Sequence, residues 1–326
     1  MSSHDALRPI GSRRAASIFN LSIYLVFALL LLVFSLMSQH FLTFGNFYST
    51  LLNGAPLILI SCAITYALIT GLIDLSVAAV SYVAGSVCGI LLRNIGTPIW
   101  VAFLGGVLFA IALGSINALL IVRFRMNPLL TTLGMMLALR GLGKIITKDR
   151  TILMGEQIGA IRQAKIESLN GFPLVVILVL LVVIASQVIF TQTRIGRHMV
   201  AVGCDPKAAA AVGINVKRVQ TFALLMTSGI CGIAGVVWVI TLGAVITRGL
   251  NAYEFLAIAS AVLGGTSLFG GRGSFLPGSF IGALILLFIA DGLTIAGASP
   301  YIMPFVRGSI IFVAMYADSL RVRFEQ

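Results

Sequence analysis

The chain has 326 residues, of which 59% are hydrophobic and only 10% are charged. Soluble globular proteins carry roughly 25% charged residues. This composition excludes a soluble fold, because so few polar groups could not cover its surface. Apolar runs of about 20 residues are long enough to cross a bilayer as helices. The sequence therefore predicts an all-α polytopic membrane protein. Its formal net charge of +12 must be explained by where the charges lie.

A short basic tail, residues 1–17, precedes the first long apolar run at 18–37. Because no small-x-small cleavage site follows that run, we expect a membrane span rather than a removed signal. Hydropathy predicts a single transmembrane domain over 18–320 and a C-terminal tail over 321–326. About ten helices are expected in this domain, at 18–37, 51–70, 75–92, 98–122, 126–146, 172–191, 218–241, 252–270, 275–296 and 301–318.

Basic residues are distributed unevenly between the two sides of these spans. With the N-terminus inside, the inside segments carry 13 Lys and Arg residues and the outside loops carry six. Cytoplasmic loops of membrane proteins are enriched in Lys and Arg, so both termini are expected to face the cytoplasm. Topology and lipid headgroups then account for the net charge, and no nucleic-acid partner is expected.

The stretch "TGLIDLSVAAV", Thr70 to Val80, places a carboxylate between two apolar runs. Thr70-Gly71 weakens a helix, Asp74 is a good helix N-cap, and Ser76 can contribute to the cap. The pattern predicts a broken helix that restarts, and such breaks occur at membrane depth only where they line protein or a water-filled cavity. A plain cytoplasmic turn between two spans is the alternative.

Two loops are long, an outer one at about 147–171 and an inner one at about 192–217. Within the inner loop, "DPKAAAAVG" predicts a helix of about two turns. Asp205 can cap it, Pro206 suits its first position, and Gly213 ends it. This helix is either part of an ordinary ordered loop or a docking element for another protein.

A second irregular stretch, "LGGTSLFGGRGSFLPG", spans Leu263 to Gly278. Its six glycines, one proline and several hydroxyl side chains are not typical of a plain span. The hydroxyls of Thr266 and Ser267 and the free backbone groups suit a polyhydroxylated solute. A tight inner turn around Arg272 is the alternative.

Six charged residues are expected at membrane depth, where each needs a partner or water: Asp74, Arg140, Lys144, Glu254, Asp291 and Arg307. Asp291 and Arg307 lie eight positions either side of an expected outer turn, so they are predicted to form a structural ion pair. Arg140 and Lys144 share one helix face near its outer end. They either extend toward the outer surface or face a pore entrance.

Motifs for catalysis and cofactor binding are missing from the sequence. There is no P-loop, no His–Glu metal motif and no G-x-S-x-G elbow. The four cysteines form no metal-like cluster and are expected to be packing residues. We therefore expect no catalytic residue, no metal site and no cofactor in this chain.

Four motifs resemble those of a known family. "GLIDLSVA" resembles "GGIDLSVG", departing at Leu72 and Ala78. "NPLLTTLGMMLALRGL" resembles "PxxxTLGxxxxxRGL". "GRHMVAVGCDPKAAAAVGINV" resembles "GRxxxAxGxNxxAAxxxGINV", with Asp205 where Asn is usual, and "LGGTSLFGGRGS" resembles "LGGTSLxGGxGS". In this order they resemble permease subunits of ATP-binding-cassette importers of the ribose, xylose and arabinose class, which belong to a larger family that includes branched-chain amino acid permeases.

The resemblance implies one half of a sugar channel in a bacterial inner membrane. A second permease copy or a related chain would complete the pore, a periplasmic binding protein would deliver a monosaccharide or polyol, and a cytoplasmic ATPase would drive import. The expected pathway residues are Asp74, Ser76, Thr132, Arg140, Thr266 and Ser267. The expected ATPase-facing residues are Arg197, Asp205, Pro206, Ala209, Gly213 and Ile214.

Three other functions stay open from the sequence. A permease of the same type could carry a nucleoside, a signalling furanose or an amino acid, because specificity in a binding-protein scheme lies mostly outside this chain. An ion-coupled secondary carrier would use Asp74 in coupling. An intramembrane enzyme would need a catalytic cluster that the sequence does not show.

Overall fold

The structure, a computed structural model, describes residues 10–155, 174–306, 308–312 and 316, which are almost entirely helical. The main helices are α1 (Ile10–Met37), α2 (Phe44–Ile69), α3 (Val77–Ile90), α4 (Ile99–Ala118), α5 (Pro128–Thr147), α7 (Leu174–Gln192), α8 (Arg194–Cys204), α9 (Pro206–Ala211), α10 (Val216–Leu242), α11 (Tyr253–Leu263) and α12 (Phe280–Ile295). Shorter elements are the π-helical turns η2 (Leu91–Ile95), η3 (Leu119–Arg123) and η4 (Phe275–Ser279), the 3₁₀ turn η5 (Pro300–Ile302), and strands β1 (Ile152–Leu153) and β2 (Ala244–Val245).

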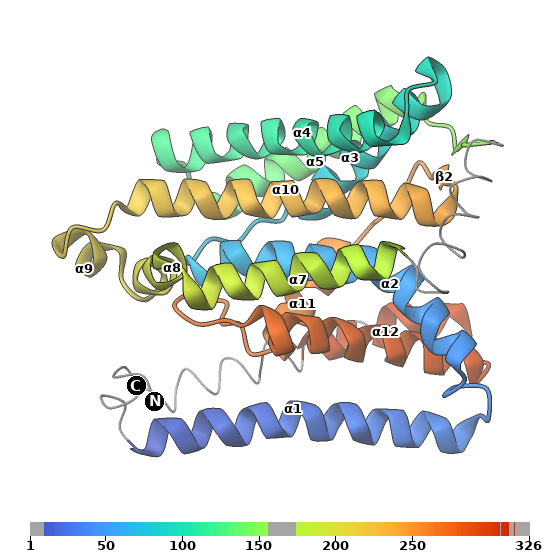
Figure 1. Cartoon of the computed structure of the whole chain (residues 1–326), viewed down its shortest axis with the longest axis horizontal. Helices are drawn as coiled ribbons and strands as arrows, with labels where there is room; N and C mark the ends of the chain where they lie inside the picture. The colour runs from blue at the N-terminus through green and yellow to red at the C-terminus, as the bar shows by residue number, and fades with distance from the viewer. Residues whose placement is uncertain (1–9, 156–173, 307, 313–315, 317–326) are drawn as a thin grey trace.

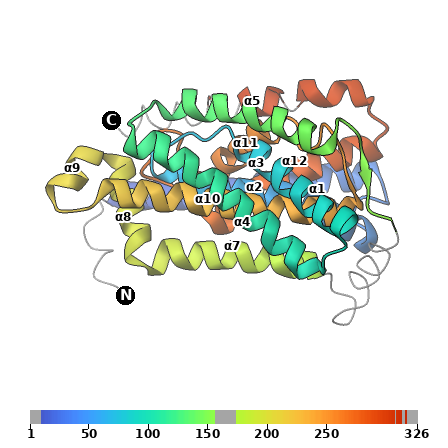
Figure 2. The same cartoon turned by 90° about the horizontal axis from the view of Figure 1, so that it is seen from above.

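Helices α2 and α10 form the centre of the bundle. Their most apolar windows are 89% and 72% buried, whereas those of α4, α5 and α7 are less than 30% buried. α10 packs against α2, α3 and α4, and α2 also packs against α11, α12 and α7. Figure 2 shows α5 and α7 on opposite sides of this centre. The peripheral helices are apolar on their outer faces, as expected where lipid is the solvent.

Small residues allow the central helices to approach closely. A Cβ on Gly235 of α10 would overlap the carbonyl oxygen of Ser81 in α3, and a Cβ on Gly85 of α3 would lie 2.6 Å from the carbonyl oxygen of Gly235. Backbone contact of this kind is how membrane helices associate without a hydrophobic driving force between them.

α1 lies along one side of the bundle, next to α12 (Figure 1). Its contact is aromatic: the rings of Phe27 and Phe288 are 5.8 Å apart, and the ring of Phe34 fills the space over Gly292. α1 begins at the same end of the molecule as α8 and α9 (Figure 1).

Seven of the expected spans are helices long and apolar enough to cross a membrane: α2, α3 with η2, α4 with η3, α5, α7, α10, and η4 with α12. The other three expected spans coincide with shorter apolar helical segments, at Ile23–Met37, Tyr253–Leu263 and Met303–Phe312. The all-α polytopic fold is thus confirmed, while the count of ten crossings stays a prediction.

Two long helices are each followed by an extended return and a short helix. After α2, residues 70–76 run back along the bundle before α3 begins, and after α10, residues 243–252 do the same before α11. α2 and α10 run in opposite directions (Figure 1). α3 packs against α10, and α11 packs against α2. The short helix that follows α2 therefore packs on α10, and the short helix that follows α10 packs on α2.

The structure corrects two expectations about element boundaries. The span expected at 252–270 ends at Leu263, and a loop follows over residues 264–274 with Gly265, Gly270 and Gly271 at positive φ. The inner loop, expected to hold one short helix, holds two, since α8 precedes α9. The outer loop at 147–171 lies largely outside the described residues, but its β1 pairs with β2 beside α10 through Ile152 and Val245.

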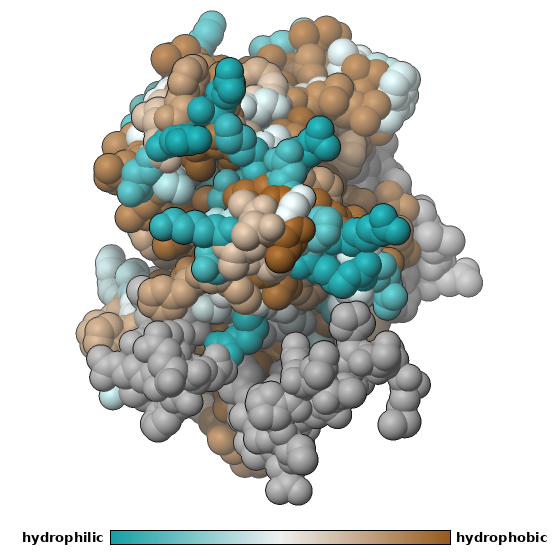
Figure 3. All heavy atoms as spheres, turned by 90° about the vertical axis from the view of Figure 1, so that its left-hand side faces the viewer, coloured by the Kyte–Doolittle hydropathy of each residue, from teal (hydrophilic) through white to brown (hydrophobic). Residues whose placement is uncertain are grey.

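Hydrophilic residues gather at the end of the molecule that carries α8 and α9. Figure 3 shows this end, where hydrophilic side chains surround apolar ones. It is the end that the distribution of Lys and Arg assigns to the cytoplasm, and we call it the inner end.

Candidate functional site

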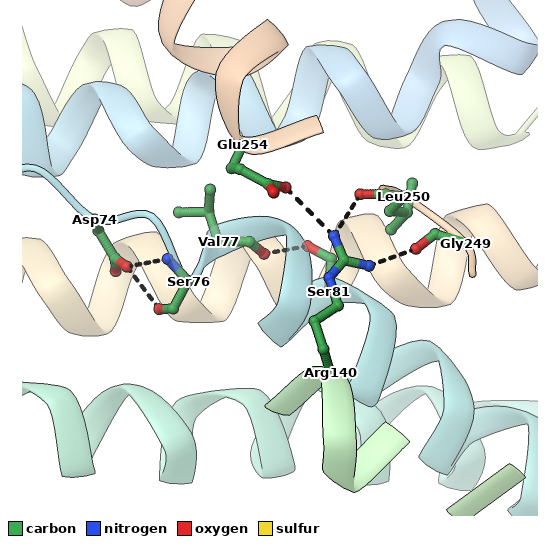
Figure 4. A network of polar contacts seen from close by, with 8 residues as sticks. All are labelled: Asp74, Ser76, Val77, Ser81, Arg140, Gly249, Leu250 and Glu254. Carbon is green, nitrogen blue, oxygen red and sulfur yellow. Dashed lines mark hydrogen bonds and ion pairs between the residues drawn. The ribbon is translucent and has the colours of Figure 1, made fainter. Parts of the chain in front are cut away.

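The break after α2 is real and is built around Asp74. Its Oδ1 accepts hydrogen bonds from the backbone N–H of Ser76 at 2.8 Å and from the Ser76 hydroxyl at 2.6 Å. Asn117 of α4 donates from Nδ2 to the same hydroxyl at 2.9 Å. All three side chains are buried, Asp74 at 1% exposure. The carboxylate therefore lies inside protein rather than in a solvated turn, and it fixes the chain that enters α3 (Figure 4).

Asn117 is only half satisfied. Its Oδ1 is buried and has no hydrogen-bond partner among the residues that the structure describes. An unpaired buried amide oxygen costs about 1–3 kcal/mol, which marks this place as one where a water, a solute hydroxyl or a rearranged side chain would gain a bond.

Thr132, near the start of α5, holds the same return from the other side. Its Oγ1 accepts from the backbone N–H of Leu75 at 3.2 Å and lies 3.2 Å from the carbonyl oxygen of Ile73. α5 begins with Asn127, whose Oδ1 accepts from the backbone N–H groups of Leu129 and Leu130 as an N-cap. α4 and α5 thus both bind the 70–76 return through one polar side chain each.

Arg140 of α5 binds the second return. Its Nη1 donates to the carbonyl oxygen of Gly249 at 2.8 Å and its Nη2 to that of Leu250 at 2.8 Å. Nη2 also lies 3.3 Å from Glu254 Oε2, at the start of α11. Figure 4 shows the guanidinium between α3 and α11, pointing at all three acceptors. The Cζ atom of Arg140 lies 5.9 Å from the ring centroid of Tyr82, within cation–π range.

This geometry separates Arg140 from Lys144, which share a helix and were expected to behave alike. Lys144 is exposed, whereas Arg140 is turned into the protein. Glu254, which the sequence marked only as a membrane-depth charge, is 5% exposed and is the partner of Arg140. An acid in the first turn of an apolar helix was the available signal, but nothing in the sequence pairs it with a residue 114 positions away.

Thr266 and Ser267 lie in the loop after α11 and are both buried. Ser267 closes a tight turn, because its backbone N–H donates to the carbonyl oxygen of Arg272 at 3.0 Å and its Oγ accepts from the N–H of Phe269 at 3.2 Å. Thr266 Oγ1 has no hydrogen-bond partner among the described residues. The loop is therefore a compact inner turn that holds one unpartnered hydroxyl.

Three chain segments meet at the inner end of α2. The backbone N–H of Gly271 donates to the carbonyl oxygen of Ile69 at 2.9 Å. Gly203, near the end of α8, fits between them, because a Cβ there would overlap both the Ile69 oxygen and the Gly271 nitrogen. We call this contact of Ile69, Gly203 and Gly271 the inner junction. It connects α8 to the first return and to the 264–274 loop.

The predicted inner helix is present as α9. Asp205 caps it by accepting from the N–H groups of Lys207 and Ala208, at 2.7 and 3.2 Å. Pro206 is its first residue and Gly213 follows it at φ +85°, a conformation that favours glycine.

Of the residues expected to face an ATPase, most are accessible but one is not. Arg197, Asp205, Pro206 and Gly213 are exposed and Ile214 is half-buried, whereas Ala209 is 3% exposed. Ala209 therefore packs inward and cannot itself touch a partner here. Val212 was missed: this apolar side chain is 76% exposed one turn beyond Ala209.

Of the expected ion pair of Asp291 and Arg307, the structure describes only Asp291. Arg307 lies outside the described residues. Asp291 Oδ2 accepts a hydrogen bond from Asn46 Nδ2 at 2.6 Å, which gives this carboxylate a partner at the start of α2. The ion pair stays a prediction.

Comparison with known proteins assigns the family. Residues 46–315 match the model of the branched-chain amino acid transport system / permease component family. The chain belongs to this permease family. It is a multi-pass membrane protein, and the matched region runs from the start of α2 to beyond α12.

Several relatives of the chain are named for sugar transport. It is 33% identical over 299 residues to the D-allose transport system permease protein of Escherichia coli (strain K12), with 91% of this chain and 90% of the relative covered. It is 30% identical to the ribose import permease protein of the same strain, covering 89% and 90%. It is 31% identical to the fructose import permease protein of Bifidobacterium longum (strain NCC 2705), covering 84% and 82%. No solved structure matches the permease significantly.

Proposed function

We propose that this chain forms the translocation pathway of an ATP-binding-cassette importer for a monosaccharide or related polyol. The observation that carries the proposal is the likeness of this chain, over 84–91% of its length, to permease proteins named for D-allose, ribose and fructose. A neutral solute agrees with the charged groups at the breaks, because each already has a partner: Asp74 binds Ser76, and Arg140 pairs with Glu254.

The partners follow from the same proposal. A separate cytoplasmic ATPase docks on the inner end, a periplasmic binding protein delivers the solute, and a second copy or a related permease completes the pore in a bacterial inner membrane. The exposed inner end supports ATPase docking, because it carries α9, which Asp205 caps, and the exposed Val212 directly after α9.

The inner junction gives this docking a mechanical consequence. α9 follows α8 after a single residue, and Gly203 of α8 touches both Ile69 and Gly271. A displacement of α8 and α9 by the ATPase therefore acts directly on the return after α2 and on the 264–274 loop. Side chains on α5 and α4 hold the two returns: Thr132 and Asn117 the first, Arg140 the second. These contacts position the pathway. Thr266 lies buried in the 264–274 loop with an unpartnered hydroxyl, so it reaches a solute only when that loop moves with α8 and α9.

Co-purification followed by reconstitution tests the proposal. The tagged chain is isolated from membranes, its partners are identified by mass spectrometry, and uptake of labelled ribose, D-allose and fructose is measured in vesicles. We expect an ATP-binding-cassette ATPase among the partners and uptake that requires ATP and a binding protein. ATP-independent uptake by this chain alone would contradict the proposal and favour an ion-coupled carrier that uses Asp74.

Specificity is tested separately. In a binding-protein scheme, candidate binding proteins are titrated with sugars, nucleosides and amino acids. Tight binding of a nucleoside or amino acid by the cognate binding protein would keep the importer class and replace the sugar.

A further inference from the structure

A groove separates the inner ends of α4 and α10. Its volume is about 420 Å³, and its walls are the end of α4 with η3 on one side and the first three turns of α10 on the other. The α4 side contributes Leu119, Val122 and Arg123, and the α10 side contributes Lys217 and Leu225. We call it the inner groove.

The two cations of the inner groove stand on opposite walls. Arg123 and Lys217 are both exposed. Neither has an acidic partner among the described residues, in which the one ion pair joins Arg140 and Glu254. The acid closest to Lys217 in sequence, Asp205, is engaged in capping α9. Two positive groups that line one groove repel each other, and an anion between them removes the repulsion.

The groove changes character along its length. Arg123 and Lys217 mark its inner mouth. Ser115 and Leu225 lie eight residues further along their helices, about 12 Å deeper toward the membrane centre at 1.5 Å per residue. Between mouth and depth the lining is mostly apolar, with Leu119 and Val122 on one wall. A cationic mouth at the inner interface followed by an apolar channel matches the order of phosphate and acyl chain in a phospholipid.

We propose that the inner groove binds an anionic phospholipid, whose phosphate lies between Arg123 and Lys217 and whose acyl chain follows Leu119, Val122 and Leu225. Basic pockets between membrane helices on the cytoplasmic side suit anionic headgroups. A water-soluble partner does not explain the apolar depth, which lies at the level of the bilayer hydrocarbon. The proposal does not depend on which solute is transported.

Native mass spectrometry of the full chain, released from nanodiscs, provides the test. Discs contain phosphatidylcholine with a rising fraction of phosphatidylglycerol, and bound lipid is counted by mass. We expect retention of phosphatidylglycerol over phosphatidylcholine. Each cation near an anionic headgroup contributes about 1 kcal/mol, so Arg123→Gln with Lys217→Gln should weaken retention roughly tenfold or more. Arg123→Lys with Lys217→Arg should keep it.

The matched control removes the same charge elsewhere. Arg93→Gln with Lys148→Gln changes two exposed cations at the opposite end of the bundle and should leave retention unchanged. Thr221→Phe fills the groove while keeping both cations and should also expel the lipid. Equal lipid loss in the control pair would overturn the proposal, as would full retention in the Thr221 variant.

A second copy of the chain is the other possible occupant. It would be seen as a dimer in pure phosphatidylcholine that the paired Gln variant dissociates, with no preference for anionic lipid in either protein. That result would also overturn the lipid assignment.

Discussion

Replacing Arg140 tests whether one side chain positions the second return. Arg140→Met keeps most of the side-chain volume and removes the guanidinium. Glu254, whose side chain is 6% exposed, then keeps a buried charge without its cation, which costs about 3–5 kcal/mol when a buried pair is broken. The carbonyl oxygens of Gly249 and Leu250 also lose donors, at about 1–3 kcal/mol each if they stay dry. These terms overlap, so we expect a loss of at least about 3 kcal/mol in the free energy of unfolding.

The double variant separates the charge from the geometry. Arg140→Met with Glu254→Gln removes both charges, so part of the loss should return, about 1–3 kcal/mol. Arg140→Lys should fall between the wild type and the Met variant, because one ammonium group cannot reach three acceptors as the planar guanidinium does.

Unfolding can be followed by the fluorescence of Trp238, whose ring packs against Gly249 and lies 6.3 Å from that of Tyr82. Trp100→Phe gives a background in which Trp238 is the single tryptophan. Lys144→Met is the matched control, because this exposed residue lies one turn further along α5 and should change stability by no more than about 0.5 kcal/mol. Equal effects of Arg140→Met and Lys144→Met would refute the reasoning.

Four further predictions test other contacts. Gly235→Ala should lower the free energy of unfolding by about 1–3 kcal/mol, because it overpacks α10 against Ser81. The control Gly229→Ala in the same helix meets only a side chain at 3.6 Å and should be neutral or slightly stabilising. Thermal unfolding compares the two proteins. Gly203→Ala should separate ATPase activity from uptake in the reconstituted complex, and normal coupling would remove the inner junction from the mechanism. Val212→Asp should abolish co-purification of the ATPase without affecting membrane insertion. Leu153→Asp, at another exposed apolar site near the outer end, should leave the ATPase bound. Asp74→Ala should destabilise the chain by about 1–3 kcal/mol through the lost bonds to Ser76, more than Asp74→Asn, which keeps an acceptor; equal melting temperatures would contradict the role of the carboxylate.

The long spans could be predicted because a chain in lipid must satisfy its own backbone. The break at Asp74 was also visible, since a helix-weakening Thr-Gly pair precedes a capping residue. The sequence did not show whether solvent or other helices surround that break. A cytoplasmic turn and a buried return have the same local residues, and the difference lies in Asn117 and Thr132, which approach from other helices.

α8 could have been predicted and was not. Thr193 accepts from the N–H of Gly196 as a cap, and Ile195, Met199 and Val202 follow at helical spacing on its buried or half-buried face. Charged residues between them hid this pattern from a hydropathy window. The early end of α11, in contrast, depends on Gly264, whose absent side chain admits the backbone of Gly278. That contact joins residues 14 positions apart through a loop that no periodicity describes.

The position of α1 has a consequence for how the protein is made. α1 leaves the ribosome first, yet α12, against which it packs, begins only at Phe280. At about 5–20 residues per second, α1 waits about 12 to 50 s for that partner. During this interval Phe27 and Phe34 face lipid instead of Phe288 and Gly292. The apolar sequence of α1 therefore also keeps this helix stable in lipid while its partner is still being made.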